Sequence, residues 1–590
     1  MVLLRPSVLS PPLQELFRKG YYFSIMLQRS QLSSHILVLI TLCGVLYLPY
    51  LGNTPLFDKG EPREALAVQD IVQRGEWLFP LKRATAIPSK PPLFHWSAAL
   101  ISEVTGKLNE TTIRFPSALY ATLGVLLVYM LGRKLYGGEA GLIGGAILAT
   151  TMVYADQALS ARVDMTLCFF LTVSLVLFYS LYRGFLNHPL WYFILYGLVG
   201  IGTLAKGPLG ILLPGLVIGG FLTLKRRWDL MLKLVFHPGV ILTLLLALGW
   251  YGLAVSRGGE GFVNRQLLQE NIERFFGGSG HNHPVNYYFS YLFSLGLPWS
   301  LFFPFMFWDV FKNHPAGSDD RLFLTSWFLI MFVFFSLSAG KRSVYLLPLY
   351  PPLALLLGDW VWRQGKAVGW RLILYRSLAG VSVLSGIILM ITSLGAIWNH
   401  EPGWFFGLIA GLLRPKDRAN LLIIENALDT FGAVFTAVSI LMAVFWFALG
   451  RALWLGKIRA AALVLVGIAV GFGFVGRGIV MPVIAADKSY REFVAEVKQR
   501  MQPAERVYLF GEFNSDPVIF YYGQMIDSLE QPVAQVASEV GKGEDYLIMP
   551  SQTWQEIEKL RPGLAPPILL SAGKGPEGDA PLVLVRAQVA

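Results

Sequence analysis

The chain has 590 residues, of which 54% are hydrophobic and only 15% are charged. This composition excludes a large soluble protein and a disordered one, and it indicates a membrane protein with many spans. The 49 Lys and Arg residues exceed the 38 Asp and Glu residues. In a membrane protein that excess indicates cytoplasmic loops and contacts with lipid phosphates, and it does not argue for a nucleic-acid partner.

Apolar stretches of membrane length run through most of the sequence. The first, near 34–52, is not followed by a small-residue cleavage site, so we expect a retained helix rather than a signal peptide. A window of about 19 residues predicts about thirteen spans. They are expected near 34–52, 114–133, 140–159, 164–183, 191–205, 207–224, 236–255, 287–310, 321–340, 343–362, 371–396, 429–449 and 460–482.

Lys and Arg in alternate loops predict the orientation of these spans. Arg18, Lys19 and Arg29 precede the first span, and basic clusters recur in most of the alternate loops after it. Because cytoplasmic loops are enriched in Lys and Arg, we expect a cytoplasmic N-terminus at 1–33. The transmembrane domain then covers 34–485, and its first outer loop is 53–113.

The composition changes from about residue 486. The segment REFVAEVKQRM is charged and helical in pattern, whereas RVYLFGEF, PVIFYYG, DYLIMP and PLVLVRAQ are rich in strand-forming residues. This alternation predicts a soluble α/β domain over 486–590. By the span count, the domain lies outside the cytoplasm. The two cysteines, Cys43 and Cys168, lie in apolar segments and indicate neither a disulfide framework nor a cysteine metal site.

The first outer loop carries a dense set of charges between two apolar segments. Pro62 suits the first turn of a helix, and Ala65, Val68 and Val72 then recur at helical spacing. We expect an amphipathic helix along the membrane surface with its charges toward water. In SKPPLFHW, Lys90 stands on proline-restricted backbone, a setting that points an ammonium at a phosphate.

Several motifs in order resemble a known family. They are GEPREALAVQDIVQRGEWLFP, SKPPLFHW, RFPSALYATLGVLLVYMLGRKLYG, SARVDM, LAKGP, ENIERFFGGSGHNHP and SLSAGKRSVYLLPLYP, over about 34–362. The set is similar to bacterial glycosyltransferases of the C-type membrane fold, in the group of aminoarabinose transferases and protein O-mannosyltransferase-like enzymes. The resemblance implies a helical polytopic domain with a small extracytoplasmic α/β domain. It also implies transfer of a sugar from a polyprenyl phosphate to a lipid, glycan or protein on the outer side, as in lipopolysaccharide or protein glycosylation.

The resemblance also implies roles for individual residues. Lys90, Lys341 and Arg342 stand where the family places phosphate-binding cations, and Tyr345 follows as a hydroxyl donor. Lys341 and Arg342 have an alternative role as anchors of helix ends at lipid head groups. Further candidates are Arg63, Arg162 and Lys206.

A carboxylate is expected to take the proton of a hydroxyl acceptor. The family's first-loop motif begins Asp-Glu, and the matching residues here are Gly60 and Glu61, so the aspartate is missing. Glu61 is the first candidate and Asp58 the second, with a helix-capping role as the alternative for Glu61. Asp164 in ARVDM is a third candidate, and its alternative role is as charge partner of Arg162.

Metal binding is where the sequence departs most from the aminoarabinose-type pattern. Ser89 and Asn271 replace an acidic residue and a histidine, and both changes remove good ligands. His281 and His283 are an alternative pair in a glycine-rich loop. We therefore predict no obligatory metal or other cofactor, with a divalent cation as the alternative.

Two other classes of protein stay open at this point. A transporter is expected to place its ionisable residues near the bilayer midplane, whereas the candidates here stand at helix ends. A non-catalytic envelope scaffold is compatible with the missing aspartate. The sequence does not identify the sugar, the acceptor, the prenyl chain length or the oligomeric state.

Overall fold

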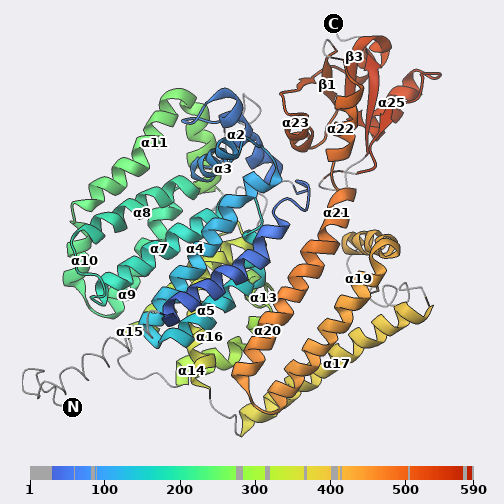
Figure 1. Cartoon of the computed structure of the whole chain (residues 1–590). Coiled ribbons are helices and arrows are strands. Elements are labelled where there is room, and N and C mark those ends of the chain that lie inside the picture. The colour runs from blue at the N-terminus through green and yellow to red at the C-terminus, as the bar shows by residue number, and fades with distance from the viewer. Residues whose placement is uncertain are drawn as a thin grey trace, which may run out of the picture.

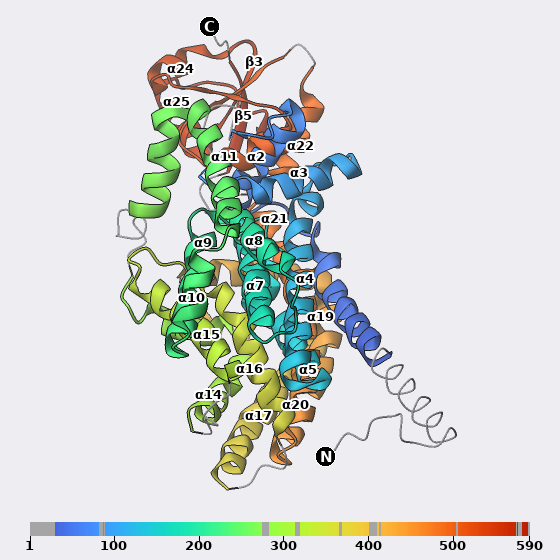
Figure 2. The same cartoon turned by 90° about the vertical axis from the view of Figure 1, so that its left-hand side faces the viewer.

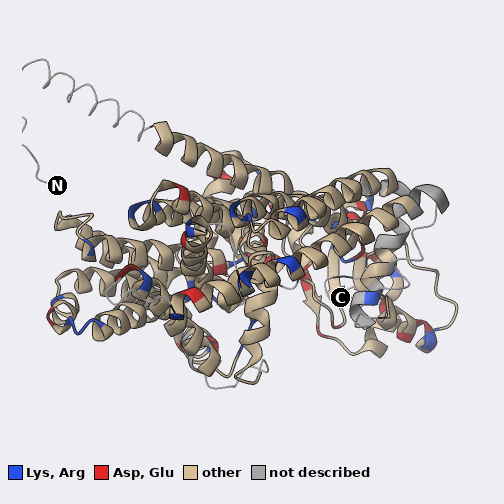
Figure 3. Cartoon of the chain, turned by 90° about the horizontal axis from the view of Figure 1, so that it is seen from below, with Lys and Arg blue, Asp and Glu red and all other residues tan. Residues whose placement is uncertain are grey.

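A helical bundle and a small mixed domain make up the computed structural model, shown in Figure 1. It describes residues 30–58, 60–81, 87, 89–273, 283–312, 319–364, 369–399, 410–411, 415–502, 505–573, 575 and 581–587. His281 lies outside these residues. Charged residues are scattered over a largely uncharged bundle (Figure 3).

Nine helices in the described part of the chain are long and apolar enough to cross a membrane. A bent pair, Tyr287–Leu295 with Trp299–Lys312, counts as a tenth if it is one span, and three shorter apolar helices lie between the others. The protein is therefore a multi-pass membrane protein. The predicted count of thirteen is not confirmed, because a full crossing needs about 20 residues and the three shorter helices have 10–17.

The first half of the bundle begins with the helix Ser30–Tyr50, which ends in the 3-10 turn η2 (Leu48–Tyr50). The helices that follow it are α2 (Glu61–Arg74), α3 (Leu93–Thr105), α4 (Glu110–Tyr136), α5 (Gly138–Thr150), α6 (Met152–Gln157), α7 (Val163–Tyr182), α8 (Leu190–Lys206), α9 (Leu209–Leu224), α10 (Trp228–Val235), α11 (Gly239–Phe262) and the π-helix η3 (Val263–Glu273).

The second half of the bundle consists of α13 (Tyr287–Leu295), η4 (Trp299–Phe302), α14 (Phe303–Lys312), α15 (Asp319–Leu337), η5 (Ser343–Leu349), α16 (Tyr350–Arg363), α17 (Trp370–Asn399), α19 (Pro415–Trp454), α20 (Ile458–Gly473), η6 (Phe474–Val480) and α21 (Met481–Asp487). One large apolar cluster, which includes Leu175, Trp327 and Leu355, forms the core. Glycines allow close helix packing, because a Cβ at Gly358 would lie 2.7 Å from the Ala140 carbonyl oxygen of α5.

The C-terminal domain contains α22 (Arg491–Arg500), β1 (Val507–Phe510), α23 (Asp516–Tyr522), β2 (Asp527–Leu529), α24 (Val533–Glu539), β3 (Val540–Pro550), α25 (Ser551–Leu560), β4 (Leu569–Leu570) and β5 (Leu582–Ala587). The sheet has the order β2-β1-β3-β5-β4. Strand β1 is parallel to both neighbours, with Tyr508 opposite Asp527 and Leu547. Strand β5 is antiparallel to β3 and β4.

One strand-like segment of this domain is a helix. PVIFYYG was predicted to be β-rich, but it forms most of α23 (Asp516–Tyr522), which is followed by Gly523 with φ +83°. Pro517 suits a first helical turn, and a glycine with positive φ is a common helix end. These two signals outweigh the strand propensity of Val518, Ile519 and Phe520, whose side chains are buried.

The predicted loop helix is also confirmed as α2, but its surroundings differ from the expectation. Its apolar residues Ala65 and Val68 share an apolar cluster with Phe493 and Val518 of the C-terminal domain. Glu61, Glu64 and Asp70 are buried too, so these charges do not face water as predicted. Figure 2 shows the cause, since α3 and the C-terminal domain lie directly around α2.

Candidate functional site

Glu61 forms a buried ion pair at the start of α2. Its two carboxylate oxygens accept hydrogen bonds from Nε and Nη2 of Arg114 at 2.8 and 2.7 Å. The Ala161 N–H donates a third bond at 2.7 Å. Only 4% of Glu61 and 2% of Arg114 are exposed. The geometry gives Glu61 a structural task, and its predicted catalytic role stays a prediction.

Asp58 occupies a more open position in the same loop. Its Oδ1 accepts the N–H groups of Gly60 and Glu61 at 2.6 and 2.7 Å, and its Oδ2 accepts Nη2 of Arg162 at 2.7 Å. Partial burial raises the pKa of Asp58, but the Arg162 charge and the hydrogen bonds outweigh it, so that pKa lies below its usual value. A third of the side chain, 34%, is exposed.

Gly60, where the family has an aspartate, adjoins the Arg162 guanidinium. A Cβ added at Gly60 would lie 2.6 Å from Cζ of Arg162, which is closer than real Cβ contacts. The volume that a side chain at position 60 needs is therefore filled by Arg162. The structure links Arg162 to Asp58, which lies two positions earlier in the loop.

Asp164 joins several of the predicted cations into one cluster. It forms an ion pair with Lys206, and Arg162 and Lys90 are within electrostatic reach of its carboxylate. Lys206 in turn lies over the ring of Tyr345, 4.4 Å from the centroid. Five of the predicted residues thus meet at one end of the bundle: Asp164, Arg162, Lys206, Tyr345 and Lys90. Asp164 therefore pairs with Lys206, and its expected alternative partner, Arg162, acts on it through charge.

Lys90 has an acidic partner that the sequence reasoning missed. Its ammonium forms an ion pair with Glu270 of η3, and both side chains are largely buried, with 12% and 16% exposed. Arg63 also lies within electrostatic reach of Glu270. The signal was available, because Glu270 directly precedes Asn271 in the motif ENIERFF, but a π-helix that turns it toward the first loop has no sequence signature.

Arg63 is held in place by Glu64, whose buried carboxylate also contacts His95. Its Nε and Nη2 donate to Oε1 of Glu64 at 3.1 and 2.8 Å, and Nε2 of His95 lies 2.8 Å from the other oxygen. Burial raises the pKa of Glu64, but the charges of Arg63 and the hydrogen bond with His95 outweigh it and hold that pKa far below its usual value. Sequence reasoning named neither Glu64 nor His95.

Lys341 and Arg342 lie on the segment after α15. The Lys341 ammonium donates to the backbone carbonyls of Ser338 and His283, the second at 2.9 Å, and 3% of the residue is exposed. The N–H of Arg342 donates to the Tyr288 hydroxyl at 3.2 Å. The described contacts of Lys341 are therefore with backbone oxygens, and its predicted phosphate contact stays a prediction.

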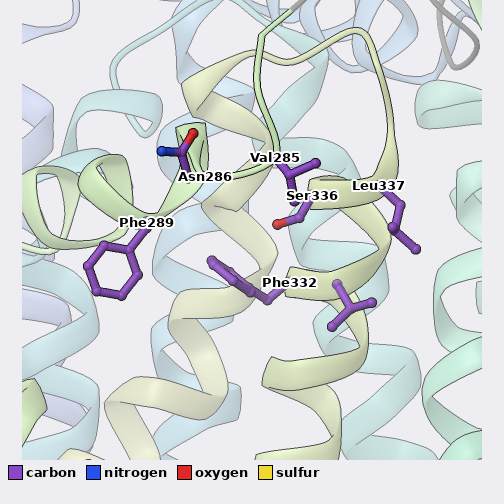
Figure 4. Close-up of a pocket in the computed structure, with 7 residues that line it drawn as sticks. Val285, Asn286, Phe289, Phe332, Ser336 and Leu337 are labelled. Atoms are coloured by element: carbon purple, nitrogen blue, oxygen red, sulfur yellow. The ribbon is translucent and has the colours of Figure 1, made fainter.

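An apolar pocket of about 400 Å³ lies beside this segment. Figure 4 shows its wall, with Phe289 on one side and Phe332 and Leu337 of α15 on the other. Ser336 and Asn286 are its polar members. Leu337 and Phe289 are 69% and 65% exposed, so the pocket opens sideways at the surface of the bundle. A lining of this kind suits a hydrocarbon chain.

The described residues do not fit a tight metal site. Among them, no group of three His, Cys, Asp or Glu side chains is placed to share a metal ion. Glu64 and His95 lie within reach of each other, but they are hydrogen-bonded to one another. The predicted absence of an obligatory metal stays a prediction.

Three comparisons relate the chain to known proteins. A family model described as dolichyl-phosphate-mannose-protein mannosyltransferase matches residues 89–251. An undecaprenyl phosphate-alpha-4-amino-4-deoxy-L-arabinose arabinosyl transferase of Pseudomonas aeruginosa is 34% identical over 325 residues, which are 54% of this chain and 58% of the relative. An uncharacterized protein of Aquifex aeolicus is 28% identical over 330 residues, 55% of this chain and 63% of that one. The chain thus spans less than two thirds of these relatives.

Solved structures extend the likeness to nearly the whole fold. ArnT from Cupriavidus metallidurans, bound to undecaprenyl phosphate, matches with a TM-score of 0.71 and 20% identity, over 93% of this chain and 97% of that one. The archaeal oligosaccharyltransferase AglB from Archaeoglobus fulgidus matches with a TM-score of 0.50 and 12% identity, over 89% of this chain and 70% of that one. The resemblance inferred from the motifs and the predicted fold class are confirmed.

Proposed function

Because this chain is a relative of the bacterial aminoarabinose transferases and has their C-type membrane fold, we propose that it transfers a sugar from a polyprenyl phosphate to an acceptor at the outer face of the membrane. The relative's name contains undecaprenyl phosphate and an arabinosyl group. For this chain we propose the class of donor, a sugar linked to a polyprenyl phosphate, and an acceptor that is a lipid, a glycan or a protein.

The cluster around Asp164 is the observation that carries this proposal. Breaking the bond between an anomeric carbon and a phosphate oxygen requires the departing phosphate's charge to be held. Lys90, Arg162 and Lys206 bring three cations to one carboxylate, and Arg63 adds a fourth near Glu270. When a donor binds, its phosphate would replace Asp164 and Glu270 as the partner of these cations. The acids keep the cations paired and oriented until it binds.

The prenyl chain is assigned to the apolar pocket between α13 and α15. Ser336 and Leu337 line that pocket and immediately precede the segment with Lys341 and Arg342. A lipid lying there presents its phosphate end to this segment. Tyr345, a few residues later, contacts Lys206 of the cluster through its ring. The donor would enter from the bilayer, because the pocket opens at the side of the bundle.

We assign the acidic role in the first loop to Asp58 rather than Glu61. Asp58 is partly open to solvent, whereas both oxygens of Glu61 are taken by Arg114. In a single displacement the acceptor oxygen bonds to the anomeric carbon, its proton passes to Asp58, and the polyprenyl phosphate departs with inversion. A phosphate acceptor needs no base, and Asp58 then serves only to orient Arg162.

The orientation is proposed from the loop charges, with the N-terminus in the cytoplasm and the C-terminal domain outside it. The first loop, which carries Asp58 and Lys90, lies next to that domain (Figure 2). A transporter is disfavoured, because these charges stand at helix ends rather than at the middle of spans. The comparisons also favour a transferase over a scaffold, since the named relative is an enzyme.

Membranes that contain the protein test the proposal with labelled polyprenyl-phosphate sugars. We expect transfer by the wild type and its loss in Lys90→Met, while Lys107→Met, an exposed lysine of the same loop, retains it. A lipid and glycan profile of a deletion strain identifies the missing sugar and acceptor. An unchanged profile together with no transfer from any donor would support the scaffold, and product with retained configuration would refute the single displacement.

A further inference from the structure

The C-terminal domain packs directly on the first loop and shares an apolar core with it. Leu56 and Val68 of the loop belong to the same buried cluster as Tyr490, Val518 and Ile519 of the domain. In Figure 2 the domain lies over α2 and α3. The loop that carries Asp58 is therefore covered by a domain that the family model, matching 89–251, does not reach.

Polar contacts cross this interface as well, and Tyr521 makes two of them; another joins Gln73 of α2 to the Gly523 carbonyl at 2.6 Å. The backbone N–H of Leu56 donates to the Tyr521 hydroxyl at 2.6 Å, and that hydroxyl donates to Oε1 of Glu110 at 2.9 Å. Arg491 lies 3.3 Å from the same carboxylate oxygen. Burial and the neighbouring Glu110 charge raise the pKa of Tyr521, so the hydroxyl keeps its proton and donates.

These contacts fix the backbone just before Asp58. Arg114 donates to the carbonyls of Leu51 and Thr54 at 3.0 and 2.7 Å. It also binds Glu61 at the start of α2. Leu56 lies between these two points, and its amide is held by Tyr521. Asp58 follows two residues later and reaches Arg162 at 2.7 Å, so a shift at Leu56 moves one end of that ion pair.

We propose that Tyr521 is a positioning residue for the first loop, and that its hydroxyl places Asp58 against Arg162. The C-terminal domain then takes part in the transfer by holding the loop in register with the cluster. The kinetic part of this inference rests on the proposed function, whereas the structural part does not.

Tyr521→Phe and Tyr522→Phe are a matched pair for testing it. Both remove one hydroxyl from α23, but among the described residues that of Tyr522 donates to Met501 Sδ, at 3.8 Å, within the domain. In the full-length protein we expect Tyr521→Phe to speed hydrogen exchange of the amides of residues 56–58, while Tyr522→Phe does not. We expect kcat for transfer to fall ten- to a hundredfold, as misplacement by about 1 Å does, with the donor KM unchanged.

The outcomes distinguish a failure of the positioning role of Tyr521 from a failure of the proposed function. If the wild type transfers no sugar, the proposed function fails, and the amide exchange of residues 56–58 still decides whether Tyr521 holds the loop. Equal exchange in both variants overturns the proposal, as does a wild-type kcat in Tyr521→Phe. If Tyr521→Phe does not fold, Glu110→Gln replaces it, and it must raise the same exchange. In a double mutant with Asp58→Asn, Tyr521→Phe is expected to cause no further loss of kcat.

Discussion

Glu61 and Arg114 form a two-point ion pair that ties the start of α2 to α4. The pair is closed on both sides, since Ala161 N–H also donates to Glu61 at 2.7 Å and Arg114 also binds loop carbonyls. The pair links the first loop, α4 and the start of α7. Its main consequence is for folding, because removal of one partner leaves a buried charge alone.

Glu61→Gln is therefore expected to destabilise the protein. Loss of one member of a buried pair costs about 3–5 kcal/mol, and thermal unfolding in detergent measures the effect. Glu496→Gln is the control, since Glu496 pairs with Arg500 at 4.0 Å with more than half of each side chain exposed. That change is expected to cost about 0–1 kcal/mol. Equal melting of both variants would contradict a structural role for Glu61.

Gly60→Ala is expected to reduce transfer with little effect on stability. The added Cβ would lie 2.6 Å from Cζ of Arg162, and a flexible guanidinium can move away at low cost. Its ion pair with Asp58 would then break. We expect kcat to fall by at least about tenfold, while Gly44→Ala, where a Cβ meets nothing within 4 Å, leaves it unchanged. Wild-type kcat in Gly60→Ala would show that the placement of Arg162 is unimportant.

The helix α2 shows how much of the site the sequence could predict. Pro62 and the spacing of apolar residues are local signals, and they predict a helix that the structure has at Glu61–Arg74. The partners of its acids are not local. Arg114 comes from 53 residues later in the chain, and only the packing of α4 beside the loop selects it over Arg63 or Arg162.

The charged residues of the cluster could be predicted from the sequence, but their ion-pair partners could not. Lys90, Asp164 and Lys206 were named from motifs and topology, and the structure brings them together. Glu270 was not predicted as the partner of Lys90, because the π-helix that brings the two together has no sequence signature. Tyr521 escaped for a similar reason, since a segment rich in strand-forming residues folds as a helix and presents its hydroxyl to a loop more than 400 residues earlier.

The acid stability of the first loop is expected to depend on Glu64. Its folded-state pKa lies far below the usual value, and the unfolded value is about 4.3. The stabilisation is thus complete above about pH 5 and is lost as the pH falls through the folded-state pKa. The difference in unfolding free energy between the wild type and Glu64→Gln should therefore shrink as the pH falls below about 4.

Asp70 supplies a control for that measurement, because its contribution to stability is expected to change with pH in the opposite direction. Burial raises the pKa of Asp70 in spite of hydrogen bonds from Leu81 N–H and Arg74. The charged form is therefore favoured in the unfolded chain, and the wild type loses stability relative to Asp70→Asn as the pH rises from about 4. If both differences moved in the same direction with pH, the assigned causes would be wrong.

Removal of metal ions is expected to leave transfer intact. Ser89 and Asn271 stand where the aminoarabinose-type pattern has an acid and a histidine, and the described residues include no group of three potential ligands. In this protein Lys90 is paired with Glu270. In the proposed mechanism, cationic side chains would supply the charge that a divalent cation would otherwise bring to the phosphate. Metal analysis of the purified protein and transfer after EDTA treatment check this. If stoichiometric metal were found, and chelation abolished transfer that zinc or magnesium then restored, the phosphate would require a metal in addition to the cluster.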